Sequence, residues 1–438
     1  MPALTDDLKV ILLGAIETNT LVVLCGAGLS VPLPSGLPGA IQVARACYDR
    51  WLPTEALDPA LRDDVDKLAG HFHAKGQFDT NFIKLVPWGE LMGIPNKGHA
   101  AIADLLISRG AHGALSANFD TMIERWAQER KLDFQGALTG QEAVDFNTTS
   151  NPLLKFHGCM TRAKHETLWT KGQLAEPAIQ SKIESCSQWI TQNLPGKHLV
   201  VVGFWTDWGY LNDVLANAFT INTAASVTVV DPSPTPDLNT KAPDLWAKLN
   251  ALSAKFEHVA VSGADFLDEV RIEYSKSWLA KFYQRGASLA TAVGITSTPS
   301  ASTLGGEELY NLRQDAQGVP YHRAATLKEP SMDAAQASLM HFELAEQGAT
   351  REGPWLRHAG KTIRVINGAG RELAELKGSY REPSSVLQSD VVICAGAIKL
   401  GTPARIIASG SGMSIVKSSP GGGSNWLTRE EAHAALGL

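Results

Sequence analysis

A glycine-rich turn near the start of the chain has the composition of a phosphate-binding site. The segment Gly26-Ala27-Gly28-Leu29-Ser30 follows the apolar run 21–24, with Cys25 between them. Glycines let the backbone approach phosphate oxygens, and the first N–H groups of a following helix carry partial positive charge. The segment therefore predicts a site for a diphosphate. Glycine turns after buried strands are also common where no phosphate binds, so the prediction depends on other residues.

Further polar segments follow apolar runs later in the chain. An asparagine amide both donates and accepts hydrogen bonds, and an imidazole takes up a proton near neutral pH. Asn118 and His157 are therefore candidates for orienting a substrate and for moving a proton. The segments concerned are Ser116-Ala117-Asn118-Phe119-Asp120, Phe156-His157-Gly158, Gly203-Phe204 and Val230-Asp231.

Alternating strands and helices must position these residues. Apolar runs predict strands at about 21–25, 114–117, 153–156, 198–202, 227–230 and 258–261, with helices between them. Nearly all-apolar strands that alternate with helices indicate an α/β fold, a Rossmann-like parallel sheet with helices on both faces. Ligands of such sheets bind at the carboxyl ends of the strands, where every segment named above falls. Residues 53–95 lack strand alternation and predict a helical insertion.

The composition is that of a globular protein and excludes several classes. The chain has 438 residues, of which 44% are hydrophobic and 19% charged, and this length predicts more than one domain. A formal net charge of −6 gives no indication of direct nucleic-acid binding. The five cysteines form no Cys-x-x-Cys pair, which argues against a zinc ribbon and a disulfide framework. Without a signal-peptide pattern or a membrane-length apolar run, we expect a cytoplasmic protein with no membrane partner.

The composition changes near residue 286 and divides the chain. Residues 286–306 are rich in Gly, Ser and Thr and predict a flexible linker between a domain over 1–285 and a domain over 307–438. Candidate strands at 362–366, 390–394 and 404–408 predict that the smaller carboxyl-terminal domain is β-rich. A Gly/Ser-rich stretch covers 418–424.

The order of these segments resembles the sirtuin family over roughly residues 8–285. The glycine turn with Gly36-Leu37-Pro38 looks like the first sirtuin signature, and Ser116–Asp120 resembles the second. Phe156-His157-Gly158 is similar to the catalytic His-Gly of the family. The segments that resemble its remaining elements are Pro95-Asn96 with His99, Gly203-Phe204, Val230-Asp231 and Gly263-Ala264-Asp265.

Several positions depart from the family pattern, and these departures indicate which group within the family the chain resembles. The chain cannot supply the four zinc cysteines of protein-deacylating sirtuins, Gly39-Ala40-Ile41 stands where Asp-Phe-Arg is usual, and Ala117 replaces a Gln. In this the chain resembles the sirtuin-like NAD hydrolases of bacterial anti-phage defence. The resemblance implies NAD as substrate, no zinc, and cleavage to nicotinamide and ADP-ribose that aborts an infection by depleting the cofactor.

The resemblance also implies a role for each candidate residue. Cleavage of the nicotinamide–ribose bond passes through an oxocarbenium-like centre, where Asn118 would hold a water and ribose hydroxyls and His157 would accept a proton. Asp120 would accept from the nicotinamide carboxamide. The remaining predicted contacts are Ser30 with the backbone of Gly26, Ala27 and Gly28 for the diphosphate, Gly203 on the nucleotide side, and Asp231 for the adenine-side ribose.

Simpler interpretations remain open at each position. Asn118 and Asp120 could simply be turn and helix N-cap residues. His157 could be an ordinary loop histidine, and Asp231 could be a turn residue. A protein deacylase or ADP-ribosyltransferase and a non-catalytic ADP-ribose or NAD sensor are the alternative functions. A Rossmann dehydrogenase is disfavoured because the third fingerprint glycine is absent after Gly28.

An NAD hydrolase that is always active would poison its host, so we expect restraint. The resemblance implies a homo-oligomer and a second protein of the same defence system. An ATPase, an Argonaute-like protein and a nucleotide-sensing protein are equally compatible with the sequence. The domain over 307–438 is the candidate for this regulatory contact.

Overall fold

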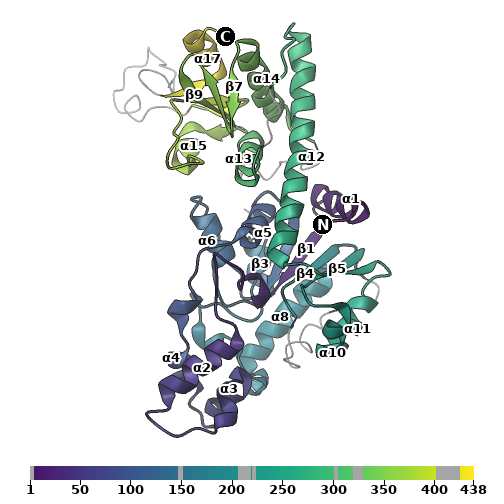
Figure 1. Cartoon of the computed structure of the whole chain (residues 1–438), viewed down its shortest axis with the longest axis vertical. Coiled ribbons are helices and arrows are strands. Elements are labelled where there is room, and N and C mark those ends of the chain that lie inside the picture. The colour runs from purple at the N-terminus through teal and green to yellow at the C-terminus, as the bar shows by residue number, and fades with distance from the viewer. Residues whose placement is uncertain are drawn as a thin grey trace, which may run out of the picture. The chain divides into compact units, whose positions relative to one another are not determined.

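The computed structural model divides the chain into two compact units (Figure 1). It describes residues 4–146, 151–205, 219, 223–299, 304–318, 329–400 and 425–438. The first unit comprises Met1–Glu129 and Asp133–Arg271, and the second comprises Arg130–Leu132 and Ile272–Leu438. Each unit is built around its own sheet.

A six-stranded parallel sheet forms the centre of the first unit, in the order β3-β2-β1-β4-β5-β6. All five residues of β1 are buried, as expected for an apolar strand between two neighbours and two helical layers. Because all strands run in the same direction, their carboxyl ends meet at one edge. The strands are β1 (Leu21–Cys25), β2 (Ala111–Ser116), β3 (Leu153–Leu154), β4 (His198–Val202), β5 (Ser226–Val230) and β6 (Phe256–Val259).

Helices cover both faces of this sheet (Figure 1). On one face, alternate strand residues such as Val22 and Leu24 share a core with side chains of α8 (Pro177–Asn193), α10 (Thr235–Lys241) and α11 (Pro243–Ala251). Elsewhere α1 (Asp6–Glu17) packs on β1, and α5 (Lys97–Ile107) packs on β2. The predicted Rossmann-like α/β fold is confirmed.

The predicted helical insertion is present after α2 (Ala40–Trp51). It contains α3 (Val65–Ala74) and α4 (Ile83–Leu85), with the short turns η2 (Pro59–Leu61), η3 (Phe78–Phe82) and η4 (Trp88–Leu91). Its own apolar cluster includes Phe72, Phe82 and, from a later part of the chain, Trp169. The remaining elements of the unit are α6 (Met122–Gln128), α7 (Gly140–Phe146), η5 (Lys164–Glu166) and η6 (Lys171–Ala175).

The glycine turn forms the single 3₁₀ turn η1 (Ala27–Leu29), and the prolines at 32, 34 and 38 separate it from α2, which begins at Ala40. One local prediction in this unit was wrong in detail. The last strand spans Phe256–Val259 instead of 258–261. It is a half-buried edge strand, so its polar residues hide the apolar signal.

A mixed five-stranded sheet forms the second unit, in the order β13-β11-β9-β8-β7. The strands β9, β11 and β13 are parallel, whereas β7, β8 and β9 form an antiparallel meander. The expected sheet is confirmed, and the candidate strand at 404–408 lies outside the described residues, as does the stretch 418–424. The strands are β7 (Thr350–Glu352), β8 (Trp355–His358), β9 (Lys361–Asn367), β11 (Val391–Ala395) and β13 (Trp426–Thr428), with β10 (Arg371–Glu372) and β12 (Ile398–Lys399) as a separate pair.

Helices add more to the second unit than the sequence had predicted. The helices α13 (Gly306–Gln317) and α14 (Met332–Glu346) pack against β9, and α17 (Arg429–Leu436) packs on β13. A short helix, α15 (Leu373–Ser379), follows β10. The helix α12 (Gly263–Ala292) continues into the range that composition had suggested as a linker, because Ala287, Leu289 and Ala290 are strong helix formers.

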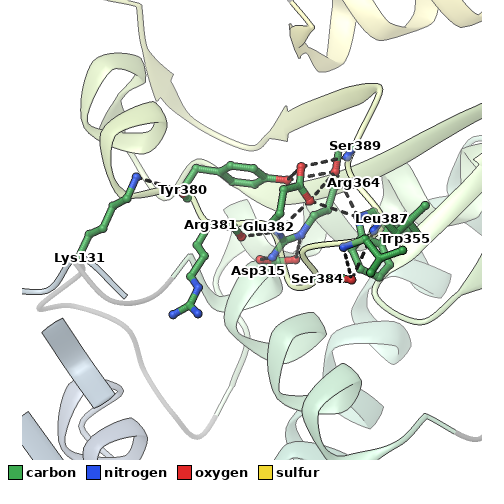
Figure 2. A network of polar contacts seen from close by, with 11 residues as sticks. Lys131, Asp315, Trp355, Arg364, Tyr380, Arg381, Glu382, Ser384, Leu387 and Ser389 are labelled. Atoms are coloured by element: carbon green, nitrogen blue, oxygen red, sulfur yellow. Dashed lines mark hydrogen bonds and ion pairs between the residues drawn. The ribbon is translucent and has the colours of Figure 1, made fainter. Parts of the chain in front are cut away.

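Arg364 on β9 lies at the centre of a buried polar network in the second unit (Figure 2). Its Nε and Nη2 atoms donate to both carboxylate oxygens of Asp315 on α13, at 2.7 and 2.5 Å. Its Nη1 atom donates to the carbonyl of Arg381, and its guanidinium lies 4.9 Å from the centre of the Tyr380 ring. The Tyr380 hydroxyl donates to Glu382 at 2.8 Å. The network thus ties the segment after α15 to α13 and β9.

No helix among the described residues is both long enough and apolar enough to span a bilayer.

Candidate functional site

The carboxyl ends of β1, β2 and β4 hold the glycine turn in place. The N–H of Gly26 donates to the carbonyl of Val202 at 3.1 Å, and the N–H of Gly28 donates to Gly203 at 2.8 Å. On the other side, the N–H of Ala117 donates to the carbonyl of Cys25 at 2.9 Å. Three segments far apart in the sequence therefore meet at the edge where a ligand is expected.

The glycines are required by the close approach of two backbones. A Cβ atom at Gly26 would lie 2.6 Å from the Cα atom of Phe204. Gly203 has a φ of +57°, and a Cβ there would lie 2.6 Å from the Leu29 nitrogen. Gly26 is buried, whereas Ala27 and Gly28 are exposed at the tip of the turn. The tip thus offers accessible backbone next to the site.

A buried hydrogen-bond network connects the turn to the second predicted segment. The Ser30 hydroxyl donates to Asp120 Oδ2 at 2.8 Å and accepts from Asn118 Nδ2 at 3.2 Å. His99 Nε2 lies 3.1 Å from the same hydroxyl. Because the Asn96 N–H donates to His99 Nδ1, the ring carries its hydrogen on Nε2 and donates to Ser30. The predicted contact of Ser30 with a diphosphate stays a prediction, since this network engages its hydroxyl.

The Asn118 side chain is held in one orientation. Its two amide hydrogens go to the Gly26 carbonyl at 3.1 Å and to Ser30. Its Oδ1 atom is buried, and no residue in the described part of the chain donates a hydrogen bond to it. A buried acceptor without a partner costs about 1–3 kcal/mol. An oriented amide oxygen of this kind is ready to accept a hydrogen bond from a bound molecule.

Asp120 has partners within the chain for all three of its oxygens. Its Oδ1 accepts from the N–H of Met122 at 3.0 Å, at the start of α6, and its Oδ2 accepts from Ser30. Its backbone carbonyl accepts a hydrogen bond from Lys155 Nζ. The N-cap-like interpretation of Asp120 is therefore part of its role, and the predicted contact with a carboxamide stays a prediction.

His157 contacts both neighbours of Asn118. Its Nδ1 atom donates to the carbonyl of Ala117 at 2.8 Å, and its ring stacks on Phe119 with centroids 4.6 Å apart. The pKa of His157 is lowered to about 4, chiefly by burial; the hydrogen bond to the Ala117 carbonyl opposes this shift, and the positive charge of Lys182 contributes to it. The ring is therefore neutral near pH 7, with its hydrogen on Nδ1 and its lone pair on Nε2.

An aromatic stack continues from the imidazole. Phe119 also stacks on Trp169, with centroids 4.4 Å apart, and Trp88 packs edge-on against both rings. Trp169 belongs to the cluster of the helical insertion, so the insertion supports the ring plane of His157. Trp88 and Trp169 were not predicted as site residues, because isolated aromatic residues in a sequence usually indicate core.

Lys155 and Glu124 also escaped prediction. Lys155 Nζ lies 3.0 Å from Glu124 Oε1 on α6, and the two side chains are only 1% and 6% exposed. Burial alone would lower the pKa of the Lys155 ammonium, but attraction to Glu124 raises it above its ordinary value. The pair contacts the Asn118–Asp120 segment through the hydrogen bond from Lys155 Nζ to the Asp120 carbonyl.

Gly203 and Asp231 occupy neighbouring strand ends with different surroundings. The N–H of Gly203 donates to the carbonyl of Val230 at 3.2 Å, which joins the glycine turn to β5. Asp231 Oδ1 accepts from the N–H of Ser233 at 2.9 Å, as a turn residue does. Within the described residues, Asp231 shares no hydrogen bond with Asn118 or His157. The structure thus brings the other candidates together and leaves Asp231 at the adjoining strand.

In the part of the chain that the structure describes, no group of three or more His, Cys, Asp or Glu side chains could hold a metal ion.

Comparison with known proteins finds likeness only among solved structures. No family model and no curated protein matches the chain. A structure described as a structural basis for the mechanism and regulation of Sir2 enzymes is 15% identical, with a TM-score of 0.35, and the match covers 62% of this chain and 97% of that one. A Sir2 homologue in complex with NAD is 16% identical, with a TM-score of 0.33, over 59% and 91% of the two chains. A serine-to-alanine variant of a Sir2 homologue with ADP-ribose is 15% identical, with a TM-score of 0.34, over 63% and 98%.

These identities and TM-scores describe a distant likeness in fold. The function of the chain is therefore argued from its own residues.

Proposed function

We propose that the chain is an NAD glycohydrolase, which cleaves NAD to nicotinamide and ADP-ribose at the edge formed by β1, β2 and β3. The observation that carries this proposal is the Asn118 side chain. Its amide hydrogens are engaged by Gly26 and Ser30, and its oxygen is buried without a donor among the described residues. That oxygen suits a ribose hydroxyl or the attacking water.

His157 is suited to accept the proton that the reaction releases. In the proposed step, the bond between the ribose carbon and the pyridinium nitrogen breaks, and nicotinamide leaves with the electron pair. Water bonds to the ribose carbon from the other face, and its proton passes to His157 Nε2 and then to solvent. A pKa near 4 makes His157 a weak base, which is adequate because the oxocarbenium-like centre already makes the bound water acidic.

The remaining candidates are proposed to bind and to position. The exposed backbone of Ala27 and Gly28 would hold the diphosphate, with Gly26 and Gly203 forming the support beneath it. Ser30 and Asp120 would fix the Asn118 amide through the network described above. Asp231 remains the candidate for the adenine-side ribose, because it follows the strand next to β4.

We also propose, from the motif resemblance, that the protein is an abortive-infection effector of anti-phage defence. It would be a cytoplasmic homo-oligomer that stays inactive until a second protein or a nucleotide signal releases it through the region 307–438. An ATPase, an Argonaute-like protein and a nucleotide-sensing protein remain equal candidates for the partner.

The test is product analysis with the full chain. The purified protein is incubated with NAD, with and without the protein encoded beside its gene, and the products are separated by chromatography. We expect free nicotinamide and ADP-ribose, and a loss on the order of 100-fold in turnover for Asn118→Ala, because the site loses its orienting group. Asn239→Ala, which changes an exposed asparagine on α10, serves as the matched control.

Other outcomes would redirect the assignment. Undiminished hydrolysis in Asn118→Ala would contradict it. A modified protein instead of free ADP-ribose would favour the deacylase or transferase alternative, and binding of ADP-ribose without turnover would favour the sensor.

A further inference from the structure

The Lys155–Glu124 ion pair is hydrogen-bonded to the segment that carries Asn118. Lys155 precedes His157 by two positions, and its Nζ atom donates to the backbone carbonyl of Asp120, two positions after Asn118. The same Nζ atom lies 3.0 Å from Glu124 Oε1 on α6. One ammonium group thus connects the segment that carries His157 to the segment that carries Asn118.

The surroundings of the pair leave it little freedom. A Cβ atom at Gly136 would lie 2.5 Å from Lys155 Cδ and 2.9 Å from Glu124 Oε1, so the backbone there packs directly on both side chains. Lys155 is also fixed through its own backbone, since its N–H donates to the carbonyl of Ala137 at 2.8 Å. The position of Nζ, and with it that of the Asp120 carbonyl, is therefore set by its neighbours.

A core has no need of this pair for stability alone. Removing two charges from water is costly, and a buried ion pair replaced by apolar side chains of similar volume often leaves stability unchanged or higher. What an apolar pair cannot supply is a hydrogen-bond donor to the Asp120 carbonyl at the beginning of α6. This hydrogen bond needs a side chain with a donor at its end, and Lys155 supplies it.

We propose that Lys155 is a positioning residue for the reaction. It holds the Asn118–Asp120 segment against the His157 segment, so that the Asn118 oxygen and the His157 imidazole keep the separation that one sugar requires. This inference rests on the proposed NAD hydrolysis and adds a residue that touches neither substrate nor water.

Two variants separate positioning from stability. Lys155→Met leaves the Glu124 carboxylate buried without its partner, so we expect a lower melting temperature and lower turnover. Lys155→Met combined with Glu124→Met removes both charges, and we expect the melting temperature to recover. Turnover should stay on the order of 10- to 100-fold below wild type in the double variant, because the Asp120 carbonyl still lacks its donor.

The kinetic constants supply the discriminating readout. We expect the loss in kcat, with KM for NAD close to the wild-type value, because the glycine turn is untouched. Lys75→Met, which breaks an exposed pair with Glu55, is the matched control and should leave both constants unchanged. A double variant that regains melting temperature and turnover together would overturn the proposal, since the pair would then serve stability only.

A measurement independent of activity separates this inference from the proposed function. In the double variant, amide hydrogen exchange should be faster over residues 117–122 while other peptides of the first unit exchange as in wild type. Unchanged exchange over 117–122 would overturn the positioning role. If the wild-type chain released no nicotinamide even with its partner, the proposed function would fail, whereas the exchange result would still decide what Lys155 does.

Discussion

The protonation state of His157 is decided by its burial. The side chain is enclosed between Phe119 and the carbonyl of Ala117, and its pKa falls to about 4. Burial also lowers the pKa of His99, the other imidazole of the network. Both rings are therefore neutral near pH 7, which is the form that can accept a proton or a hydrogen bond.

This burial predicts how stability depends on pH. The folded protein protonates His157 only near pH 4, whereas the unfolded chain does so near 6.5. Between these values the unfolded state binds more protons, so the free energy of unfolding decreases as the pH falls from 6.5 to 4. The decrease attributable to His157 should reach about 3 kcal/mol. Urea denaturation at several pH values, in wild type and in His157→Gln, measures it.

The variant should show a shallower dependence, with the remainder due to His99 and other buried groups. Identical pH dependence in the two proteins would mean that His157 titrates normally in the folded state.

Some residues of the site were predictable and others were not. Asn118 and His157 could be found because each follows an apolar run, and strand ends of a parallel sheet converge. Lys155 and Glu124 are 31 positions apart, and nothing in the sequence indicates that both are buried in contact. The roles of Ser30 and Asp120 inside the network likewise needed coordinates, because side-chain partners across strands leave no pattern in sequence.

The contact between η1 and the residue that follows β4 holds the glycine turn in place. Gly28 donates to Gly203, and Gly203 adopts a left-handed conformation against Leu29. Each glycine leaves room for the backbone of the other. The exposed backbone of the same turn could also bind a diphosphate. The phosphate-binding interpretation of the first motif and the packing interpretation are therefore complementary.

We expect Gly203→Ala to destabilise the first unit by about 2 kcal/mol or more. The new Cβ would meet the Leu29 backbone nitrogen at 2.6 Å, and a φ of +57° is strained for alanine. Gly14→Ala is the matched control, since nothing lies within 4 Å of its added Cβ and it belongs to α1. That control should be neutral or more stable by roughly 0.5–1 kcal/mol.

Thermal unfolding monitored by circular dichroism compares the two variants. Equal melting temperatures for Gly203→Ala and Gly14→Ala would show that the turn relaxes at no cost.

Elements were predictable where burial is uniform. The central strands β1, β4 and β5 read as apolar runs because both of their faces are covered. The edge strand β6 is half-buried, so its bounds were misplaced. The start of the expected linker is helical instead, because its alanines continue α12.

The whole molecule consists of two units with different kinds of sheet. The parallel sheet of the first unit follows from alternating strands and helices, whereas the second unit combines a meander with parallel strands. Its sheet was predictable from the apolar runs at 362–366 and 390–394. The helix α14 was not predicted, although its Ala, Leu, Met and Glu residues favour helix, because almost all of its residues from 334 to 344 are buried and leave no polar face in the sequence.

The stability of the second unit should depend on the Arg364 network. Arg364→Met leaves the buried Asp315 carboxylate without the guanidinium that binds both of its oxygens, and we expect a loss of about 3 kcal/mol or more. Arg357→Met on the adjacent strand breaks an exposed pair with Glu352 and should cost at most about 1 kcal/mol.

Calorimetry of the full chain can assign the effect. Only the unfolding transition of the second unit should shift in Arg364→Met. A shift of the same size in both variants would mean that burial of the network contributes nothing.

The glycine turn is supported by Gly203, which lies far later in the sequence, and this has a consequence during synthesis of the chain. During synthesis the turn and Asn118 leave the ribosome first, followed by His157, yet the turn gains its backing only when Gly203 emerges. A nascent or prematurely ended chain that stops before this glycine would contain both Asn118 and His157 and still lack the backbone that supports the turn. Under the proposed function, translation would thereby delay NAD cleavage until the residue after β4 has been made.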